Sequence, residues 1–191
     1  YSRDGASYVS MDNSILWNQT YEMQNPIIDI CEEYLAIGDE KGNKIYIFNT
    51  EGLQGEIDTL LPIWQIEISN QGTVVAVLED NDVNWINYYN EEGTLIADSK
   101  TTMQNSGYPL DISISNDGVK LAVSYLYVNN GSITSNVAFY NFGSVGQNEI
   151  DNLVSGYEYQ GTVIPTVKFL DSNIAVAFGD DKTIVYEGKQ K

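Results

Sequence analysis

Histidine is missing from this sequence, and cysteine and basic residues are scarce. Its 191 residues include no histidine, one cysteine (Cys31), and nine Lys and Arg against 27 Asp and Glu. Without histidine the chain cannot build a Ser-His-Asp or Cys-His nucleophile, and it lacks the commonest general base and the commonest ligand for zinc, copper or iron. A single cysteine allows no intramolecular disulfide and argues against a zinc site. Most hydrolase and metalloenzyme classes are therefore disfavoured.

The charge balance and the lack of long apolar runs restrict the partners further. A formal net charge of −18 repels phosphate backbones and anionic lipid, so neither nucleic acid nor an acidic membrane is an expected partner. No stretch is apolar enough for a transmembrane helix. Hydrophobic residues make up 42%, which is typical of a folded chain, and the length suits one domain.

The four prolines mark a repeat. Pro26, Pro62, Pro109 and Pro165 are 36, 47 and 56 residues apart, and each precedes an alternating strand. Propeller blades repeat every 40 to 50 residues or so, and proline is tolerated at the start of a strand. We therefore divide a single propeller-like domain, 1–191, into blades. They are the end of a preceding blade at 1–25, blades at 26–61, 62–108 and 109–164, and a partial blade at 165–191.

Each blade shows the same order of signals. An alternating first strand is followed by a turn, and the second strand then carries alanine beside a β-branched residue. The third strand ends in bulky residues, and a glycine turn leads to a possible fourth strand at Leu53–Ile57 and Thr94–Ala97. The alanine pairs are Ala36-Ile37, Ala76-Val77, Ala122-Val123 and Ala175-Val176. The pattern predicts an all-β, propeller-like fold of about four antiparallel blades.

We predict an incomplete or partial propeller, because the last blade lacks a fourth strand. Ile15–Asn18 could supply that strand and close a four-bladed ring. Otherwise the chain belongs to a larger ring, and its open strand edges invite self-association. The segment 127–136, which contains Asn-Asn-Gly-Ser, is expected to form a mobile hairpin tip.

Two turns carry a family resemblance. Ser69-Asn70-Gln71-Gly72 and Ser115-Asn116-Asp117-Gly118 each lead into a strand with alanine at its centre. They resemble the turns of WD-repeat, TolB-like and quinoprotein-type propellers, with asparagine replacing proline. The whole chain is similar to an uncharacterised bacterial family of propeller-like proteins that face outward and are often membrane-anchored. The resemblance implies an extracellular or cell-surface location. It implies no active site, because the WD dipeptide, the Gly-His motif and the quinone ligands are missing.

Polar residues on the first strands are the candidates for a channel site. Asp29, Gln65, Asp111 and Lys168 stand between apolar neighbours, and Glu67 follows two residues after Gln65. First strands line the central channel of a propeller, so these groups could converge there. Paired carboxylates are all that a glycosidase requires. Solvated polar side chains are the simpler interpretation.

Loops supply the remaining candidates. Trp64 and Tyr108 are expected at one end of the blades near acidic loop residues, an arrangement that suits a sugar or a basic peptide. Asp80 and Asp82 alternate with other oxygen side chains, as calcium ligands do. Trp85 stands where the EF-hand pattern needs glycine, and turn chemistry explains these acids better. No cofactor is therefore expected.

The sequence thus favours a non-enzymatic module that binds or scaffolds, recognising protein or carbohydrate at the bacterial cell surface. One alternative is a carboxylate-dependent glycosidase or lyase that works in the propeller channel. A second alternative is a purely structural module for oligomerisation.

Overall fold

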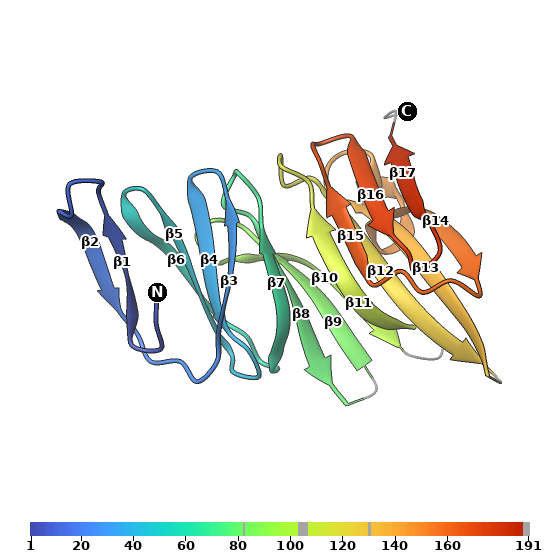
Figure 1. The fold of residues 1–191 in the computed structure, drawn as a ribbon, viewed down its shortest axis with the longest axis horizontal. Coiled ribbons are helices and arrows are strands. Elements are labelled where there is room, and N and C mark those ends of the chain that lie inside the picture. Colours follow the sequence, from blue (N-terminus) through green and yellow to red (C-terminus); the bar gives the residue numbers. More distant parts are fainter. Residues whose placement is uncertain (82, 103–106, 130, 189–191) are drawn as a thin grey trace. The chain divides into compact units, whose positions relative to one another are not determined.

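The regular structure of the chain is almost entirely β-strand (Figure 1). The computed structural model describes residues 1–81, 83–102, 107–129 and 131–188. Two short 3-10 helices, η1 (Gly146–Asn148) and η2 (Ile150–Asn152), interrupt the strands. No helix among these residues has the length and apolar character to span a membrane.

The strands are β1 (Gly5–Val9), β2 (Ile15–Thr20), β3 (Pro26–Cys31), β4 (Tyr34–Asp39), β5 (Lys44–Asn49), β6 (Gly52–Asp58), β7 (Ile63–Ile68), β8 (Val74–Asp80), β9 (Val83–Tyr89), β10 (Leu95–Thr102), β11 (Tyr108–Ile114), β12 (Lys120–Asn129), β13 (Ser132–Asn141), β14 (Leu153–Gln160), β15 (Thr166–Phe169), β16 (Ile174–Phe178) and β17 (Thr183–Glu187).

Within each sheet, every strand pairs with the strand that precedes or follows it in the sequence. Strands β3–β6, β7–β10 and β11–β14 form four-stranded antiparallel sheets, β15–β17 a three-stranded sheet and β1–β2 a hairpin. Antiparallel sheets of four sequential strands are the blades of propellers. The predicted all-β, propeller-like fold is confirmed.

The repeated alanine lies at the centre of each sheet. Ala36, Ala76 and Ala122 are fully buried and Ala175 is 1% exposed. Each lies on the second strand of its sheet, where a small side chain lets a neighbouring layer approach closely. The alanine signal in the sequence therefore marks the buried second strand of every sheet.

The two Ser-Asn-X-Gly turns have the same construction. The Gly72 N–H donates to the Ser69 carbonyl at 3.2 Å, and the Gly118 N–H donates to the Ser115 carbonyl at 2.8 Å. Both glycines have φ near +70°, a conformation that other residues adopt only with strain. The serine hydroxyl then accepts a backbone N–H where the next strand begins, that of Thr73 or Lys120.

The hairpin expected at 127–136 forms, because β12 and β13 pair through it as far as Asn129 and Ser132. One strand differs from the expectations. The sheet that begins at β11 has a fourth strand, β14, which the sequence did not indicate. Eleven residues separate β13 from β14, and this long connection hides the relation between the two strands.

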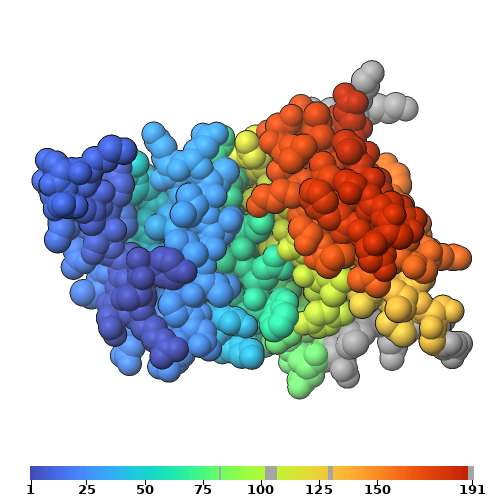
Figure 2. All heavy atoms as spheres, viewed as in Figure 1, coloured from blue at the N-terminus to red at the C-terminus, as the bar shows by residue number. Residues whose placement is uncertain are grey.

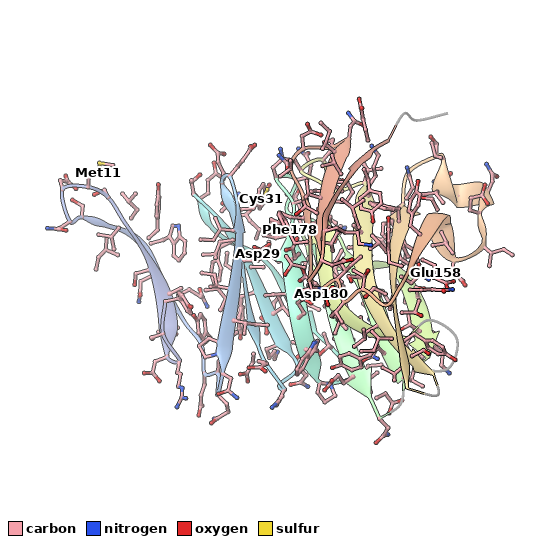
Figure 3. The ribbon with its side chains drawn as sticks, turned by 45° about the vertical axis from the view of Figure 1, so that its right-hand side comes forward. Met11, Asp29, Cys31, Glu158, Phe178 and Asp180 are labelled. Atoms are coloured by element: carbon pink, nitrogen blue, oxygen red, sulfur yellow. The ribbon has the colours of Figure 1, made fainter. Side chains whose placement is uncertain are left out.

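The chain forms two compact units. Unit 1 consists of Tyr1–Asp80 with Asn87–Asp98, and unit 2 of Asn81–Ile86 with Ser99–Lys191. In unit 1 the β1–β2 hairpin packs beside β6, and the hairpin's turn carries the exposed Met11 (Figure 3). In unit 2 a core of buried residues joins the β11–β14 sheet to the β15–β17 sheet, with Ile164, Val167 and Phe169 among its members.

Candidate functional site

The predicted channel acids Asp29 and Asp111 take part in hydrogen bonds between consecutive sheets. In unit 1 the Asp29 carboxylate on β3 accepts a hydrogen bond from the Ile68 N–H of β7 at 2.8 Å (Figure 3). In unit 2 the Asp111 carboxylate on β11 accepts one from the Val167 N–H of β15 at 2.8 Å. Both acids thus satisfy a backbone donor on the first strand of the following sheet. Their predicted role as channel-lining ligands is a separate claim and stays a prediction.

The other sequence candidates all lie on first strands, as expected for Gln65, Glu67 and Lys168, whereas Trp64 and Tyr108 were expected in the loops that enter these strands. Trp64, Gln65 and Glu67 are half-buried on β7, Tyr108 is half-buried at the start of β11, and Lys168 is exposed on β15. Asp111, Tyr108 and Lys168 belong to unit 2 and the remainder to unit 1. Convergence of these residues on one channel stays a prediction.

The calcium candidates receive no support from the geometry. Asp80 is exposed at the end of β8, and Asp82 lies outside the described residues. Within the described part of the chain, no three or more acidic, cysteine or histidine side chains are grouped so that they could hold a metal ion.

Unit 2 contains a groove that the sequence did not reveal. It has a volume of about 640 Å³ and lies between two walls, one from β13 and β14 and the other from β16 and β17. Apolar and aromatic side chains dominate, with a few polar groups among them. The lining residues that matter below are Phe139, Val154, Tyr157, Tyr159, Ile184 and Tyr186.

Phe139 is the hub of the aromatic cluster in this groove. Its ring lies edge-on to Phe169, Tyr157 and Tyr186, with centroids 6.2, 6.2 and 5.0 Å away. Edge-to-face rings at such distances attract one another beyond simple burial of area. Tyr157 is 46% exposed, so part of this aromatic surface is open to a ligand.

Two tyrosine hydroxyls give the groove a polar group. The Tyr186 hydroxyl donates to the Tyr159 hydroxyl at 2.8 Å, and the Lys182 ammonium lies 5.9 Å from the centre of the Tyr159 ring. Burial, followed by the neighbouring Tyr159 hydroxyl, raises the pKa of Tyr186 far above its usual value near 10. Tyr186 is therefore neutral at physiological pH and acts as a hydrogen-bond donor.

Hydrogen bonds join the β11–β14 sheet to the β15–β17 sheet and to the residues that flank its first strand. The Lys120 ammonium donates to the Ser172 carbonyl at 2.5 Å and to the Asn173 side chain at 2.9 Å. The Ser113 hydroxyl accepts the Phe169 N–H at 3.0 Å. The Ser124 hydroxyl donates to the Ile164 carbonyl at 2.5 Å. Because both walls are tied together at their base, the groove is a preformed feature of unit 2.

A weak signal for this groove was present in the sequence. Residues 153–160 read LVSGYEYQ, in which tyrosines alternate with polar residues as they do on a half-buried strand. The opposite wall includes β17, Thr183–Glu187, which pairs with β16 and has no pairing with β14 in the sheet order of the described residues. The juxtaposition of the two strands follows only from the packing of one sheet on the next.

Comparison with known proteins identifies the family. A family model described as a family of unknown function, DUF5711, matches residues 1–191. The chain belongs to this family. No curated protein matches its sequence.

Solved structures confirm the type of fold. The chain is similar to KlAtg21, solved in complex with the coiled coil of AgAtg16, with a TM-score of 0.68 and 14% identity over 97% of this chain and 59% of that one. It is also similar to the Dos1 propeller, with a TM-score of 0.59 and 8% identity over 96% of this chain and 50% of that one. The chain thus spans between half and three fifths of these two proteins. At such low identity the likeness establishes a propeller fold alone.

Proposed function

We propose that this chain is a non-enzymatic binding or scaffolding module, and that the groove of unit 2 docks a polypeptide partner. The observation that carries the proposal is the open aromatic wall of β14. Val154 and Tyr157 are 39% and 46% exposed, and they line a preformed groove of about 640 Å³. Exposed aromatic and aliphatic side chains beside a concave surface are typical anchor points for a partner.

Two further points support binding over catalysis. The sequence has no histidine, and burial raises the pKa of Tyr186, whose hydroxyl donates to Tyr159, so the groove offers recognition groups rather than an acid–base pair. Propellers are rigid scaffolds that present binding surfaces, and KlAtg21 was solved bound to a coiled coil. The proposal includes neither a cofactor nor a metal.

The location of the module is part of the same proposal. The resemblance of the whole chain to a bacterial family of outward-facing, propeller-like proteins supports a place on the outside of a bacterial cell. Protease treatment of intact cells that produce the full protein tests this: degradation without lysis is expected, and protection until lysis would contradict an outward-facing module.

The binding proposal is tested with displayed peptides. A library of random peptides is selected on the purified chain, and the enriched peptides are then measured against two variants by fluorescence anisotropy. Val154→Asp places a charge on the exposed wall of the groove, and we expect it to weaken binding at least about tenfold, because a buried charge without a partner is costly. Leu60→Asp is the matched control, since Leu60 is 100% exposed in unit 1.

Three outcomes would count against the proposal. Equal binding by the two variants would place the site elsewhere. Enrichment on a glycan array with no enriched peptide would assign the groove to carbohydrate, which its tyrosines could also stack against. Hydrolysis of a glycoside panel that is lost in Asp111→Asn would support the carboxylate-dependent enzyme instead.

A further inference from the structure

A cation of the chain itself lies against one tyrosine of the groove. The Lys182 ammonium is 5.9 Å from the centre of the Tyr159 ring, within the range of a cation–π contact. Lys182 belongs to the turn between β16 and β17, in the sheet that Figure 2 shows in orange-red to red at the surface of the viewed face. Its ammonium is also 3.2 Å from the Asp181 carboxylate. This end of the groove therefore already combines a tyrosine ring, a cation and a carboxylate.

Tyr157 offers a second ring of the same kind, and this ring is more open to solvent. Tyr157 stands two residues before Tyr159 on β14, so the two side chains lie on the same face of the strand. Phe139 and Tyr186 hold the ring in place, with centroids 6.2 and 5.1 Å away. Nearly half of the residue, 46%, stays exposed. Tyr157 is therefore a fixed aromatic surface that a ligand can reach.

The charges along the groove favour a positively charged ligand. Glu187 lines the groove and is exposed at one end of β17, and the Asp181 carboxylate precedes the other end. The two basic residues already have acceptors: Lys182 pairs with Asp181, and Lys120 donates to two oxygens of the turn between β15 and β16. The net charge of −18 attracts cations to the chain and repels anions from it.

We propose that Tyr157 is the docking point for a cationic side chain of the polypeptide partner, which lies on the exposed ring as Lys182 lies on Tyr159. The inference rests on the proposed function, because it names the chemistry that the groove selects in its ligand. Arginine is favoured over lysine, since its planar guanidinium stacks on an aromatic face and is less strongly hydrated than an ammonium. Glu187 adds negative charge along the same groove.

Other ligand classes use fewer of these features. A neutral sugar can stack on the Tyr157 ring, but it gains nothing from the carboxylates of the groove. An acidic or phosphorylated segment is repelled by the net charge of the chain. Only a cationic side chain uses both the aromatic surface and the negative charge.

Matched peptides test the charge of the ligand. The peptides enriched by selection on the purified chain are synthesised again with citrulline in place of each arginine and norleucine in place of each lysine. Both replacements keep the length of the side chain and remove its charge. We expect the neutral analogue to bind about three- to tenfold more weakly in fluorescence anisotropy at physiological ionic strength, because a partly exposed cation–π contact makes a modest contribution.

Variants of Tyr157 locate the cation. Tyr157→Leu keeps an apolar side chain but removes the ring, and the preference for the charged peptide should fall below about twofold. Tyr157→Phe retains the ring and should retain the preference. Tyr8→Leu is the matched control, because Tyr8 is a 39% exposed tyrosine of unit 1 and should leave the preference unchanged. Circular dichroism and urea unfolding check that each variant folds.

The result can overturn this inference without overturning the proposed function. Enriched peptides without arginine or lysine, equal binding of the charged and neutral peptides, or a preference that survives in Tyr157→Leu would each show that the inference is wrong. Peptide binding that is lost in Val154→Asp would still support the groove as the docking site. The charge of that variant lies three residues along β14 from Tyr157, about 10 Å, where it is largely screened.

Discussion

In unit 1 the outermost strands β2 and β6 pack against each other, whereas in unit 2 the outermost strand β14 borders the groove and is partly exposed. The β1–β2 hairpin of unit 1 lies against β6, and Trp17 of β2 stacks on Phe48 of β5 with ring centroids 5.1 Å apart. Phe48 is fully buried as a result. In unit 2 the β11–β14 sheet has four strands and the β15–β17 sheet that packs on it has three. The exposed residues Val154 and Tyr157 of β14 form the open side of the groove.

The inner strands of the two units follow one rule. In each unit an aspartate on a first strand accepts the backbone N–H of the next first strand, Asp29 from Ile68 and Asp111 from Val167. The units therefore differ at the outer strands and agree at the inner ones.

Truncation of one aromatic residue in each unit should give the largest contrast. Phe48→Ala leaves a cavity beneath Trp17 and Tyr46 in a closed cluster, and we expect a loss of about 3–5 kcal/mol in the free energy of unfolding. Phe139→Ala removes the hub of an open cluster that water can enter, and we expect about half that loss. Urea unfolding followed by circular dichroism measures both.

The comparison of these two variants has an internal control. Leu60→Ala truncates a side chain that is 100% exposed and should change stability by less than about 0.5 kcal/mol. Equal losses for Phe48→Ala and Phe139→Ala would mean that the groove is as well packed as the closed cluster, and the contrast between the units would be wrong.

The sequence predicted the blades well because the blade signals are local. Proline before a strand, a Ser-Asn-X-Gly turn and a buried alanine all lie within about 15 residues, and each has a direct physical cause. The strand β14 was missed because 11 residues, including η1 and η2, separate it from β13. Local periodicity does not show which earlier strand such a segment pairs with after a connection of this length.

The groove could be predicted only in fragments. The tyrosines Tyr157 and Tyr159 alternate with polar residues in the sequence, but their neighbours Phe139 and Tyr186 come from other strands. Asp29 and Asp111 were predicted to line the channel because both stand between apolar neighbours on first strands. Their hydrogen bonds to Ile68 and Val167 depend on how one sheet packs on the next, which the sequence pattern does not contain.

Loss of an inter-sheet carboxylate should have an effect of intermediate size, similar in both units. Asp111→Ala leaves the Val167 N–H without this acceptor, and we expect a loss of about 1–3 kcal/mol. Asp29→Ala should cost a similar amount through Ile68 if the inner strands follow one rule. Thermal and urea unfolding of both variants check this. Glu158→Ala removes an exposed carboxylate of β14 (Figure 3) and should be almost neutral. A large difference between Asp29→Ala and Asp111→Ala would show that the units differ at their inner strands as well.

The smallest effect is expected at the hydroxyl pair of the groove. Tyr186→Phe removes the bond to Tyr159 and should cost about 0.5–1.5 kcal/mol at pH 7, because the Tyr159 hydroxyl can turn to water on the open side. Urea unfolding at pH 7 measures this cost. A much larger loss would mean that the hydroxyl pair is sealed from solvent, and the groove would then be less open than its 46% exposed neighbour Tyr157 indicates.

The same variant should change how stability depends on alkaline pH. Burial raises the pKa of Tyr186 in the folded chain, whereas in the unfolded chain this tyrosine ionises near pH 10. Above pH 10 the unfolded chain therefore binds fewer protons than the folded chain, and stability falls as the pH rises; below pH 10 this group has no effect. Tyr186→Phe should accordingly lose less stability than the wild type between pH 9 and 11 or so, although it is weaker at pH 7. Unfolding curves across this range test the sign, and parallel losses in the two proteins would show that Tyr186 ionises in the open groove as readily as in the unfolded chain.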